Sequence, residues 1–204
     1  MFTGLIQSVV EIREVGERSP DGFKIKISKP NHWNDLKLGE SIACDGVCLT
    51  LTDFADDSLE FFVGAETLNK TTFENLKLSQ KINAERSLAL GDRLGGHVVS
   101  GHIDGTAQVL EASRDGQCLN LKLKLAPEQF RFVVPKGSLC VNGVSLTINE
   151  LDRETKTIGV YLIPETMIRT NLSLLETGDS VNIETDQFVK IIAHQMGSYR
   201  EHNP

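Results

Sequence analysis

The sequence lacks the features of several protein classes. It has no uninterrupted apolar run of about 18 residues, the length of a membrane-spanning helix, and its start, Met1 to Gly4, does not have the basic-then-apolar order of a signal peptide. Its few cysteines have neither the density of a secreted disulfide scaffold nor the paired C-x-x-C spacing of a zinc site. They are Cys44, Cys48, Cys118 and Cys140. These absences predict a cytoplasmic protein with reduced thiols, outside any membrane.

Basic runs, aromatic residues and nucleotide-binding motifs are also scarce. The formal net charge is −7 and no Lys/Arg stripe interrupts it, which argues against binding to a phosphate backbone. Aromatic residues make up 6% of the chain, too few for an oligonucleotide-binding barrel. No G-x-G-x-x-G motif follows a strand and opens a helix, so a nicotinamide module, as in a flavin-dependent reductase, is missing. A small-molecule partner is favoured over nucleic acid.

What is present is an ordinary globular composition. Hydrophobic residues make up 40% and charged residues 24% of the 204 residues. This length suits either two compact domains of about 90 to 100 residues or one larger core. Length alone does not choose between them.

An internal repeat decides for two domains. The segment Glu40–Leu51 matches Gly137–Ile148, and the identical positions are Ser, Gly, Val, Leu and Thr. The same offset lays Thr3-Gly4-Leu5-Ile6 on Ser100-Gly101-His102-Ile103. At an offset two residues longer, Glu66-Thr67 matches Glu165-Thr166, Thr71 matches Thr170, and Ile82-Asn83-Ala84-Glu85 matches Val181-Asn182-Ile183-Glu184. A loop insertion explains the change of offset, because loops tolerate changes of length that strands do not.

Each copy has the pattern of β-strands. In Val47–Thr52 and Val144–Asn149, apolar residues alternate with small polar ones, so one face of each strand belongs to a core and the other presents Cys or Ser and Thr. Further alternating runs are separated by turn signals; they are 22–27, 59–63, 119–125 and 158–163. We predict an all-β chain in which residues 1–94 and 95–186 each form a six-stranded antiparallel barrel.

The tail of the chain breaks this pattern. From Gln187 to about Tyr199, apolar residues recur at helical spacing, and Asp186 stands where a helix cap is expected. We therefore predict a C-terminal helix in residues 187–204. Its apolar stripe needs a partner, which is either the same helix in other subunits or the chain's own barrel.

The stretch Gly95–Gly105 has four glycines, His97 and His102. Glycine at this density allows a sharp turn or a close approach to a ligand, although an interdomain connection would look similar. The two histidines would lie on opposite faces of a regular strand with no third ligand nearby, so a metal site is not expected. Ser100 and His102 can share a face, where the histidine would be either a proton carrier or a hydrogen-bonded structural residue.

The differences between the copies suggest divided roles. His102 corresponds to Leu5, and Ser145 corresponds to Cys48. Two pockets that agree elsewhere would bind similar ligands and treat them differently, as a donor site and an acceptor site do. Drift between the copies explains the same differences without a function.

Five segments in order resemble one protein family. They are Met1–Gly4, Asp45–Thr50, Gly96–Gly105, Lys136–Ser138 and Asn142–Thr147. Together they are similar to the riboflavin synthases of the alpha-chain type, and the likeness covers essentially the whole chain. One departure is Asp45, where asparagine is expected and where the second copy keeps Asn142; it puts a local turn in question.

The resemblance implies an activity and an assembly. Members dismutate two molecules of 6,7-dimethyl-8-ribityllumazine into riboflavin and 5-amino-6-ribitylaminouracil by transfer of a four-carbon unit, the last step of riboflavin synthesis. It further implies a homotrimer joined by the C-terminal helices, with active sites between the N-terminal barrel of one subunit and the C-terminal barrel of the next. No metal and no cofactor are implied, and docking with lumazine synthase is left open.

The resemblance also implies which residues bind the substrate. Those expected to line the N-terminal pocket are Gly4, Leu5, Ile6, Cys48, Leu49, Thr50, Phe62, Val63, Gly64, Ala65, Glu66 and Thr67. Those expected to line the C-terminal pocket are Gly101, His102, Ile103, Ser145, Leu146, Thr147, Val160, Tyr161, Leu162, Ile163, Pro164 and Glu165, with Lys136 reaching across. Thr50 and Thr147 can bond the pteridine edge, and Glu66 and Glu165 the ribityl hydroxyls.

The reaction needs a base for a ring methyl, a nucleophile that adds to the other lumazine, and general acids. We expect His102 to carry protons with Ser145 and Thr147 beside it, and Cys48 and Ser41 to serve the N-terminal site. Asp186 is a further candidate, although capping the helix explains it as well. The alternative function is a non-catalytic lumazine or flavin carrier on the same duplicated fold. The sequence leaves open which barrel holds the donor and what makes the first addition.

Overall fold

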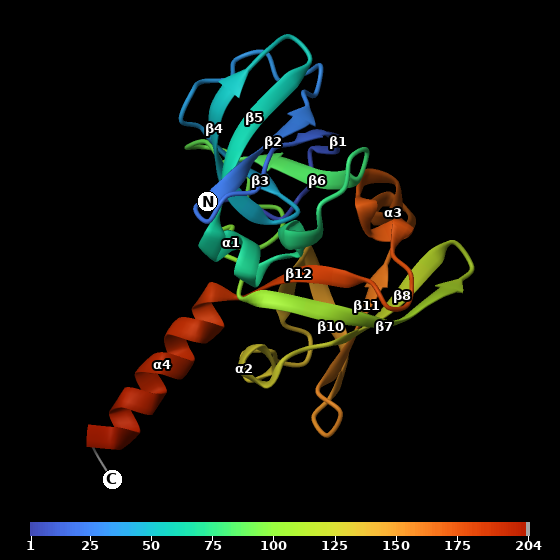
Figure 1. Ribbon diagram of the computed structural model, residues 1–204. Helices are drawn as coiled ribbons and strands as arrows, with labels where there is room; N and C mark the ends of the chain where they lie inside the picture. Colours follow the sequence, from blue (N-terminus) through green and yellow to red (C-terminus); the bar gives the residue numbers. More distant parts are fainter. Residues whose placement is uncertain (203–204) are drawn as a thin grey trace.

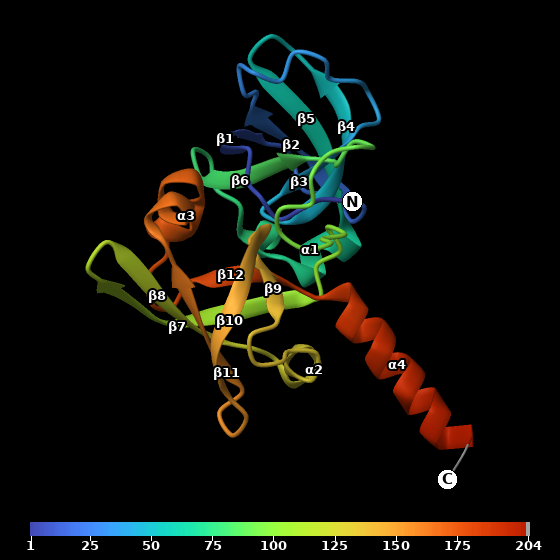
Figure 2. The same ribbon diagram turned by 180° about the vertical axis from the view of Figure 1, so that it is seen from behind.

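The chain forms two closed barrels and one projecting helix. The computed structural model describes residues 1–202, with side chains up to Met196. Figure 1 shows the two barrels one above the other with helix α4 extending away from them, and Figure 2 shows the same arrangement from behind. This confirms the predicted all-β class, the two antiparallel six-stranded barrels and the C-terminal helix.

The two barrels have the same topology. The first closes in the order β1-β2-β5-β4-β3-β6, and the second closes in the equivalent cyclic order β10-β11-β8-β7-β12-β9. The strands of the first barrel are β1 (Ser8–Val15), β2 (Gly22–Ser28), β3 (Ser41–Cys44), β4 (Val47–Phe54), β5 (Ser58–Gly64) and β6 (Lys81–Arg86). Those of the second are β7 (Gly105–Asp115), β8 (Cys118–Lys124), β9 (Ser138–Val141), β10 (Val144–Asp152), β11 (Thr157–Leu162) and β12 (Ser180–Thr185).

Short helices lie between the strands. The helical elements are α1 (Ala65–Lys70), a 3-10 turn (Thr72–Asn75), α2 (Pro127–Phe130), α3 (Pro164–Arg169), a second 3-10 turn (Asn171–Leu174) and α4 (Gln187–His202). Thr71 and Thr170 end α1 and α3 in the same way: each hydroxyl accepts a hydrogen bond from a backbone N–H of the following 3-10 turn. The two copies therefore share local detail as well as topology.

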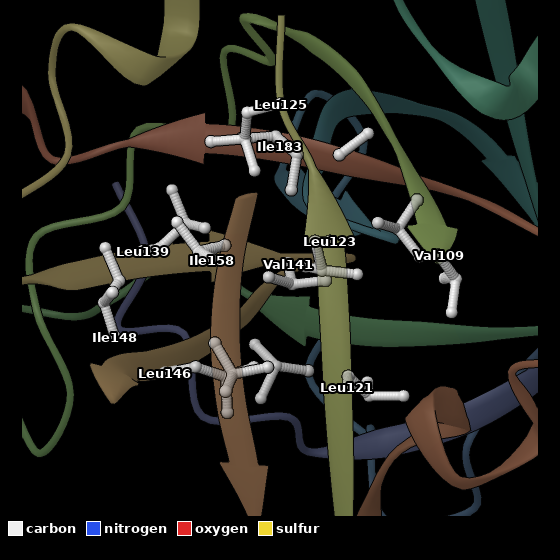
Figure 3. Close-up of a cluster of buried hydrophobic side chains, with 14 of the residues drawn as sticks. Val109, Leu121, Leu123, Leu125, Leu139, Val141, Leu146, Ile148, Ile158 and Ile183 are labelled. Carbon is white, nitrogen blue, oxygen red and sulfur yellow. The ribbon is translucent and has the colours of Figure 1, made fainter. Parts of the chain in front are cut away.

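Alternating side chains build the cores. In β4 the residues Val47, Leu49 and Leu51 are buried, whereas Thr50 and Thr52 face outward. Figure 3 shows the same arrangement in the second barrel, where Leu121, Val141 and Ile183 come from three strands and meet inside. Each such burial contributes about 1.5–3 kcal/mol. The predicted alternation is confirmed because one strand face fills a core and the other is left for a site.

The departure at Asp45 does not disturb its turn. Asp45 has φ 43 and its counterpart Asn142 has φ 45, each followed by a glycine, in the tight turns that join β3 to β4 and β9 to β10. Asp-Gly and Asn-Gly are both suited to left-handed two-residue turns. The turn at Asp45 therefore has the same backbone conformation as the turn at Asn142.

A buried polar joint ties the barrels together. The side-chain amide of Asn83 donates to the Asn142 carbonyl at 2.8 Å, and that of Asn182 donates to the Asp45 carbonyl at 2.9 Å. Asn171 from the second copy also donates to the Asp45 carboxylate at 2.9 Å. Burial raises the pKa of Asp45 to about 7, although hydrogen bonds from Asn83 and Asn171 oppose the shift.

Helix α4 begins where it was predicted. The Asp186 carboxylate accepts the Phe188 N–H at 2.8 Å and so caps the helix. Phe188, Ile191, Ile192 and Met196 are exposed, so the alternative in which the stripe packs on its own barrel is wrong for these residues. The predicted stripe member Tyr199 has its side chain outside the described part. None of the helices described is long and apolar enough to span a membrane.

Candidate active site

Each copy contributes a leading segment to the other barrel. The segments 2–6 and 99–103 pair through Phe2 and Val99, whose backbone groups exchange two hydrogen bonds at 2.7 and 3.1 Å. Beyond this crossing, Ile6 packs against the core of the second barrel and Ile103 against that of the first. We call residues 2–6 the first leader and residues 99–103 the second leader. Each leader therefore packs against the barrel of the other copy.

This exchange corrects the predicted grouping of the pockets. The Ser145 N–H donates to the Gly4 carbonyl at 2.8 Å, and the Cys48 N–H donates to the Gly101 carbonyl at 2.9 Å. Gly4, Leu5 and Ile6 thus lie with the C-terminal strands, and Gly101, His102 and Ile103 with the N-terminal ones. The resemblance implied both sets of residues, but grouping them by sequence order assigned each leader to the wrong barrel.

The first pocket is a hollow of about 230 Å³ on the N-terminal barrel. It is lined by Val47, Cys48, Glu66, Thr67, Lys70, Thr71, Gly101, His102 and Ile103. Cys48 is half-buried and His102 is exposed, and the His102 backbone N–H is held by the Ser100 hydroxyl at 3.1 Å. A thiol, an imidazole and a carboxylate thus line one small hollow.

We call the corresponding place on the second barrel the second pocket: it is the outer face of β10 and β11 with the first leader, whose Gly4 carbonyl accepts the Ser145 N–H. Thr147 and Tyr161 are exposed on these strands, and Leu5, the residue after Gly4, is 50% exposed. A hollow of about 360 Å³ is a different feature: Val160 and Tyr161 line it together with residues of β7, β8 and β10, whereas Ser145, Thr147 and Leu5 do not. Cys48 and His102 of the first pocket correspond to Ser145 and Leu5 of the second pocket.

His97 belongs to the second pocket. Its Nδ1 lies 2.7 Å from the Ser145 hydroxyl. Burial lowers the pKa of His97, although the negative charges of Asp186 and Glu184 act in the opposite direction. A neutral imidazole next to a hydroxyl can accept its proton and so activate it as a nucleophile.

This finding corrects the predicted surroundings of His102. His102 does not lie beside Ser145 and Thr147; it lines the pocket of Cys48, and His97 is the histidine at Ser145. The stretch between His97 and His102 is not a regular strand either, since only Val99 forms a bridge within it. The placement of His102 beside Ser145 followed from grouping the residues by sequence order, which the exchange of the leaders overturns.

Two glutamates occupy equivalent places. Glu66 lies 3.0 Å from Lys70 within α1, and Glu165 pairs with Arg169 within α3. The hydrogen bond and charge of Lys70 lower the pKa of Glu66, so this carboxylate is ionised at neutral pH. Both are exposed and can accept hydrogen bonds from hydroxyl groups.

Several predicted binding residues can offer only backbone groups. Their side chains are buried in the barrel cores; they are Leu49, Val63, Leu146, Val160 and Leu162. Phe62 and Ile163 are instead exposed, on and just after strands β5 and β11. The remaining members, Gly64 with Ala65 and Pro164, stand where α1 and α3 begin.

The other predicted site residues are Ser41, Lys136 and Asp186. Ser41 pairs with Thr50 across β3 and β4. Lys136 is exposed in the loop before β9, and its backbone N–H donates to the Ile148 carbonyl at 3.0 Å. Asp186 caps α4, and its charge acts on His97. Asp186 therefore has the structural role and also lies near the second pocket.

The sequence reasoning missed the groups that hold the leaders. Glu85 and Glu184 are buried and bond the leader backbones. Their match between the copies was visible in the repeat, but no pattern indicated that these strand residues reach the leaders. In the described chain, no group of three or more His, Cys, Asp or Glu side chains is placed to hold a metal ion.

Comparison with known proteins agrees with the duplication. The family model "Lumazine binding domain" matches the chain twice, at residues 3–87 and 100–186. Both matches include a leader together with the six strands of its own copy.

Curated relatives cover nearly the whole chain. A riboflavin synthase of Bacillus subtilis is 38% identical over 190 residues, which is 93% of this chain and 87% of that relative. One of Actinobacillus pleuropneumoniae is 36% identical over 94% of this chain and 88% of its own length.

Solved structures match as well. The crystal structure of LumP complexed with riboflavin has a TM-score of 0.84 and 27% identity, and the match covers 91% of this chain and 99% of that one. LumP complexed with 6,7-dimethyl-8-(1'-D-ribityl) lumazine gives a TM-score of 0.81, also at 27% identity.

Proposed function

Because this chain belongs to the riboflavin synthase family of tandem lumazine-binding domains, we propose that its two pockets hold the two lumazines of one dismutation. The chain is an enzyme, a transferase of riboflavin synthesis. The reaction joins two molecules of 6,7-dimethyl-8-ribityllumazine and releases riboflavin and 5-amino-6-ribitylaminouracil. The observation that carries the proposal is that two pockets of the same build differ in their reactive groups.

The second pocket supplies a nucleophile. With His97 neutral, the Ser145 hydroxyl, 2.7 Å from Nδ1, can lose its proton to the imidazole as its oxygen adds to the bound lumazine. The imidazolium then returns the proton in a later elimination. Asp186 and Glu184 favour the charged imidazolium once it has formed.

The first pocket supplies proton transfer. His102 can remove a proton from the acidified ring methyl of the other lumazine, and Cys48 and Thr67 lie in the same hollow. Glu66, held by Lys70, is suited to accept hydrogen bonds from the ribityl hydroxyls. Neither pocket needs a metal or a cofactor for these steps.

The two lumazines can react only if their pockets face each other. We propose a homotrimer, in which the first pocket of one subunit faces the second pocket of its neighbour. The first pocket, at about 230 Å³, is smaller than the roughly 300–1,000 Å³ typical of ligand sites. A neighbouring second pocket would enclose the ligand and bring the two lumazines together, which is worth roughly 7–11 kcal/mol in a bimolecular step. The exposed apolar stripe of α4 is a suitable contact between subunits.

Sedimentation velocity tests this assembly. The double variant Ile191→Asp, Ile192→Asp should sediment as a monomer and lose activity, because the stripe can no longer be shared. Gln195→Glu, an exposed polar position on the same helix, is the matched control and should remain assembled. A fully active monomer would contradict the intersubunit site.

A single incubation tests the activity. Purified protein with 6,7-dimethyl-8-ribityllumazine alone should produce riboflavin absorbance, one flavin for every two lumazines consumed. Uptake of ligand without turnover would favour the alternative, a carrier like LumP, for which complexes with lumazine and riboflavin are known. Binding stoichiometry also separates the two, since the enzyme should take up two ligands per chain and an antenna one.

Cellular context is a further part of the proposal. Four free cysteines, two of them fully buried, fit a reducing compartment, and we assign the protein to the cytoplasm. Docking with lumazine synthase, the source of the substrate, would shorten the path of the lumazine. Cell fractionation tests the first statement and co-sedimentation of the two proteins the second.

A further inference from the structure

We propose that the buried carboxylates Glu85 and Glu184 are positioning residues that act across the molecule: each lies in one barrel and fixes the leader that completes the pocket of the other barrel. The activity that they support is the proposed function above. Their positioning of the two leaders is a separate claim, which binding alone can test.

Glu85 holds the first leader. One oxygen, Oε1, accepts the Thr3 N–H at 2.7 Å and the Thr3 hydroxyl at 2.6 Å, and Oε2 accepts the Gly4 N–H at 3.0 Å. The Thr3 hydroxyl in turn accepts the Leu5 N–H at 3.2 Å. Glu85 is thus connected to every residue from Thr3 to Leu5.

The same leader then reaches the second pocket. The Gly4 carbonyl accepts the N–H of Ser145, the residue bonded to His97. Gly4 is therefore fixed at its N–H by the first barrel and at its carbonyl by the second. A shift of Glu85 would displace the backbone at Ser145, on the opposite barrel.

Glu184 repeats this geometry for the second leader. Its Oε1 accepts the Ser100 N–H at 2.6 Å and the Ser100 hydroxyl at 2.7 Å, and its Oε2 accepts the Gly101 N–H at 2.9 Å. The Ser100 hydroxyl accepts the His102 N–H, and the Gly101 carbonyl accepts the Cys48 N–H. Glu184 therefore holds His102 and Cys48 in register within the first pocket.

Only a carboxylate meets these demands. Three donors converge on two oxygens, and an ionised carboxylate accepts at both. A glutamine would turn its NH₂ group toward an N–H donor and leave that buried group without an acceptor, which costs about tenfold or more in an equilibrium constant. Burial raises the pKa of Glu85, and the Thr3 and Gly4 hydrogen bonds oppose this shift and favour the charged form.

The experiment follows the occupancy of each pocket separately. In a Cys118→Ser background, Cys44 and Cys140 are buried and Cys48 is the half-buried thiol, so its alkylation rate reports on the first pocket. Riboflavin, the probe, should slow this alkylation. The further exchange Cys48→Ser, Ser145→Cys moves the reporter thiol to the second pocket.

We expect a crossed pattern, in which each glutamine variant weakens riboflavin binding only in the pocket of the other barrel. Glu184→Gln should raise the riboflavin concentration that protects Cys48 by about tenfold, whereas Glu85→Gln should leave it within about twofold. With the thiol at position 145, Glu85→Gln should be the damaging change. Glu60→Gln, a largely buried carboxylate paired with Lys24 on the outer face of the first barrel, is the matched control and should change neither value.

Two variants with smaller changes allow the same test if a glutamine variant does not fold. Ser100→Ala and Thr3→Ala each remove one of the three donors and should give the same crossed pattern with smaller effects. The proposal would be overturned if each glutamate variant weakened binding in the pocket of its own barrel. Equal weakening of both pockets, or unchanged protection in both, would overturn it as well. Protection needs no turnover, so loss of the crossed pattern and lack of dismutase activity are separate results.

Discussion

The first and second pockets share a scaffold and differ in chemistry. Equivalent strands and short helices place Cys48 and Ser145 at the same position, yet one has an exposed His102 in the same hollow and the other a half-buried His97 on its hydroxyl. Both histidines come from one connecting stretch. Because the chain crosses between barrels at Val99, the residue before the crossing serves one pocket and the residue after it serves the other.

A duplicated domain can divide its labour without changing its scaffold. The strands are constrained by their cores, whereas the stretch that contains His97 and His102 is glycine-rich and lies outside any regular strand. Two similar binding faces therefore receive different reactive groups from a segment that belongs to neither set of barrel strands. The following predictions test that view.

The largest effect is expected at His97. His97→Ala should lower kcat by about a thousandfold, because Ser145 loses the base that accepts its proton. Combined with Ser145→Ala it should cost little more, since the two act as a unit, whereas combined with Cys48→Ala the losses should multiply. Single-turnover kinetics of the variants measure this. Multiplying losses with Ser145→Ala would place His97 outside the second pocket's chemistry.

The same residue predicts a pH dependence. A general base must be neutral, and burial holds the pKa of His97 below its ordinary value near 6.5. The acidic limb of kcat/KM attributable to His97 should thus lie below pH 6.5 and disappear in His97→Ala. His102→Ala, in the other pocket, should reduce turnover by more than about threefold and keep that limb.

A smaller loss is expected from Gly101→Ala. Gly101 has φ 82, and an added Cβ would lie 2.5 Å from that of Cys48, so the leader must shift in the first pocket. We expect kcat/KM to fall about a hundredfold, with a lower Tm. Gly91→Ala is the matched control, because Gly91 has φ 101 and open space around it. Equal effects of the two changes would mean that the close approach to Cys48 does not matter.

The smallest effect on activity is expected at Asp45. This residue lies in the buried polar joint between the barrels, where the second copy has Asn142. Its pKa is raised to about 7 from an ordinary 3.8, so the folded state binds the proton more tightly than the unfolded state. Stability should therefore fall as the pH rises from about 4 to 7 and stay level above that range. Asp45→Asn, which copies Asn142, should be more stable by on the order of 1–3 kcal/mol at pH 8 and nearly equal at pH 4.

Urea unfolding of both proteins at several pH values measures this difference. Activity should change little, because Asp45 lies in the joint and lines neither pocket. Parallel stability curves for the two proteins would show that the Asp45 carboxyl remains ionised without cost.

Local pattern predicted much of the fold. Alternation in Val47–Thr52 specified which face was core, because a buried apolar side chain and an exposed threonine have opposite preferences for water. The repeat then gave the same answer twice, and the helical spacing after Asp186 gave the last element. The candidate site residues came instead from the family resemblance, and the repeat supported them only by matching the segments in which they lie.

The partners of the leaders could not be read in this way. Gly4 and Ser145 are far apart in sequence, and their hydrogen bond depends on how two finished barrels meet. His97 received no role from the sequence, because its contact with Ser145 depends on an irregular connection to which no periodicity applies. Glu85 and Glu184 appeared as the last residues of a matched strand block, with nothing to indicate their three donors.

The sequence alone determined that the protein is one β-barrel repeated, with a helix at its end and two similar ligand faces, since apolar periodicity and internal identity are local properties. The pocket that each leader completes was settled by the way the two barrels pack together. That choice depends on packing Phe2 against Val99 and on burying two carboxylates with all their donors, which are contacts between copies that no single segment encodes.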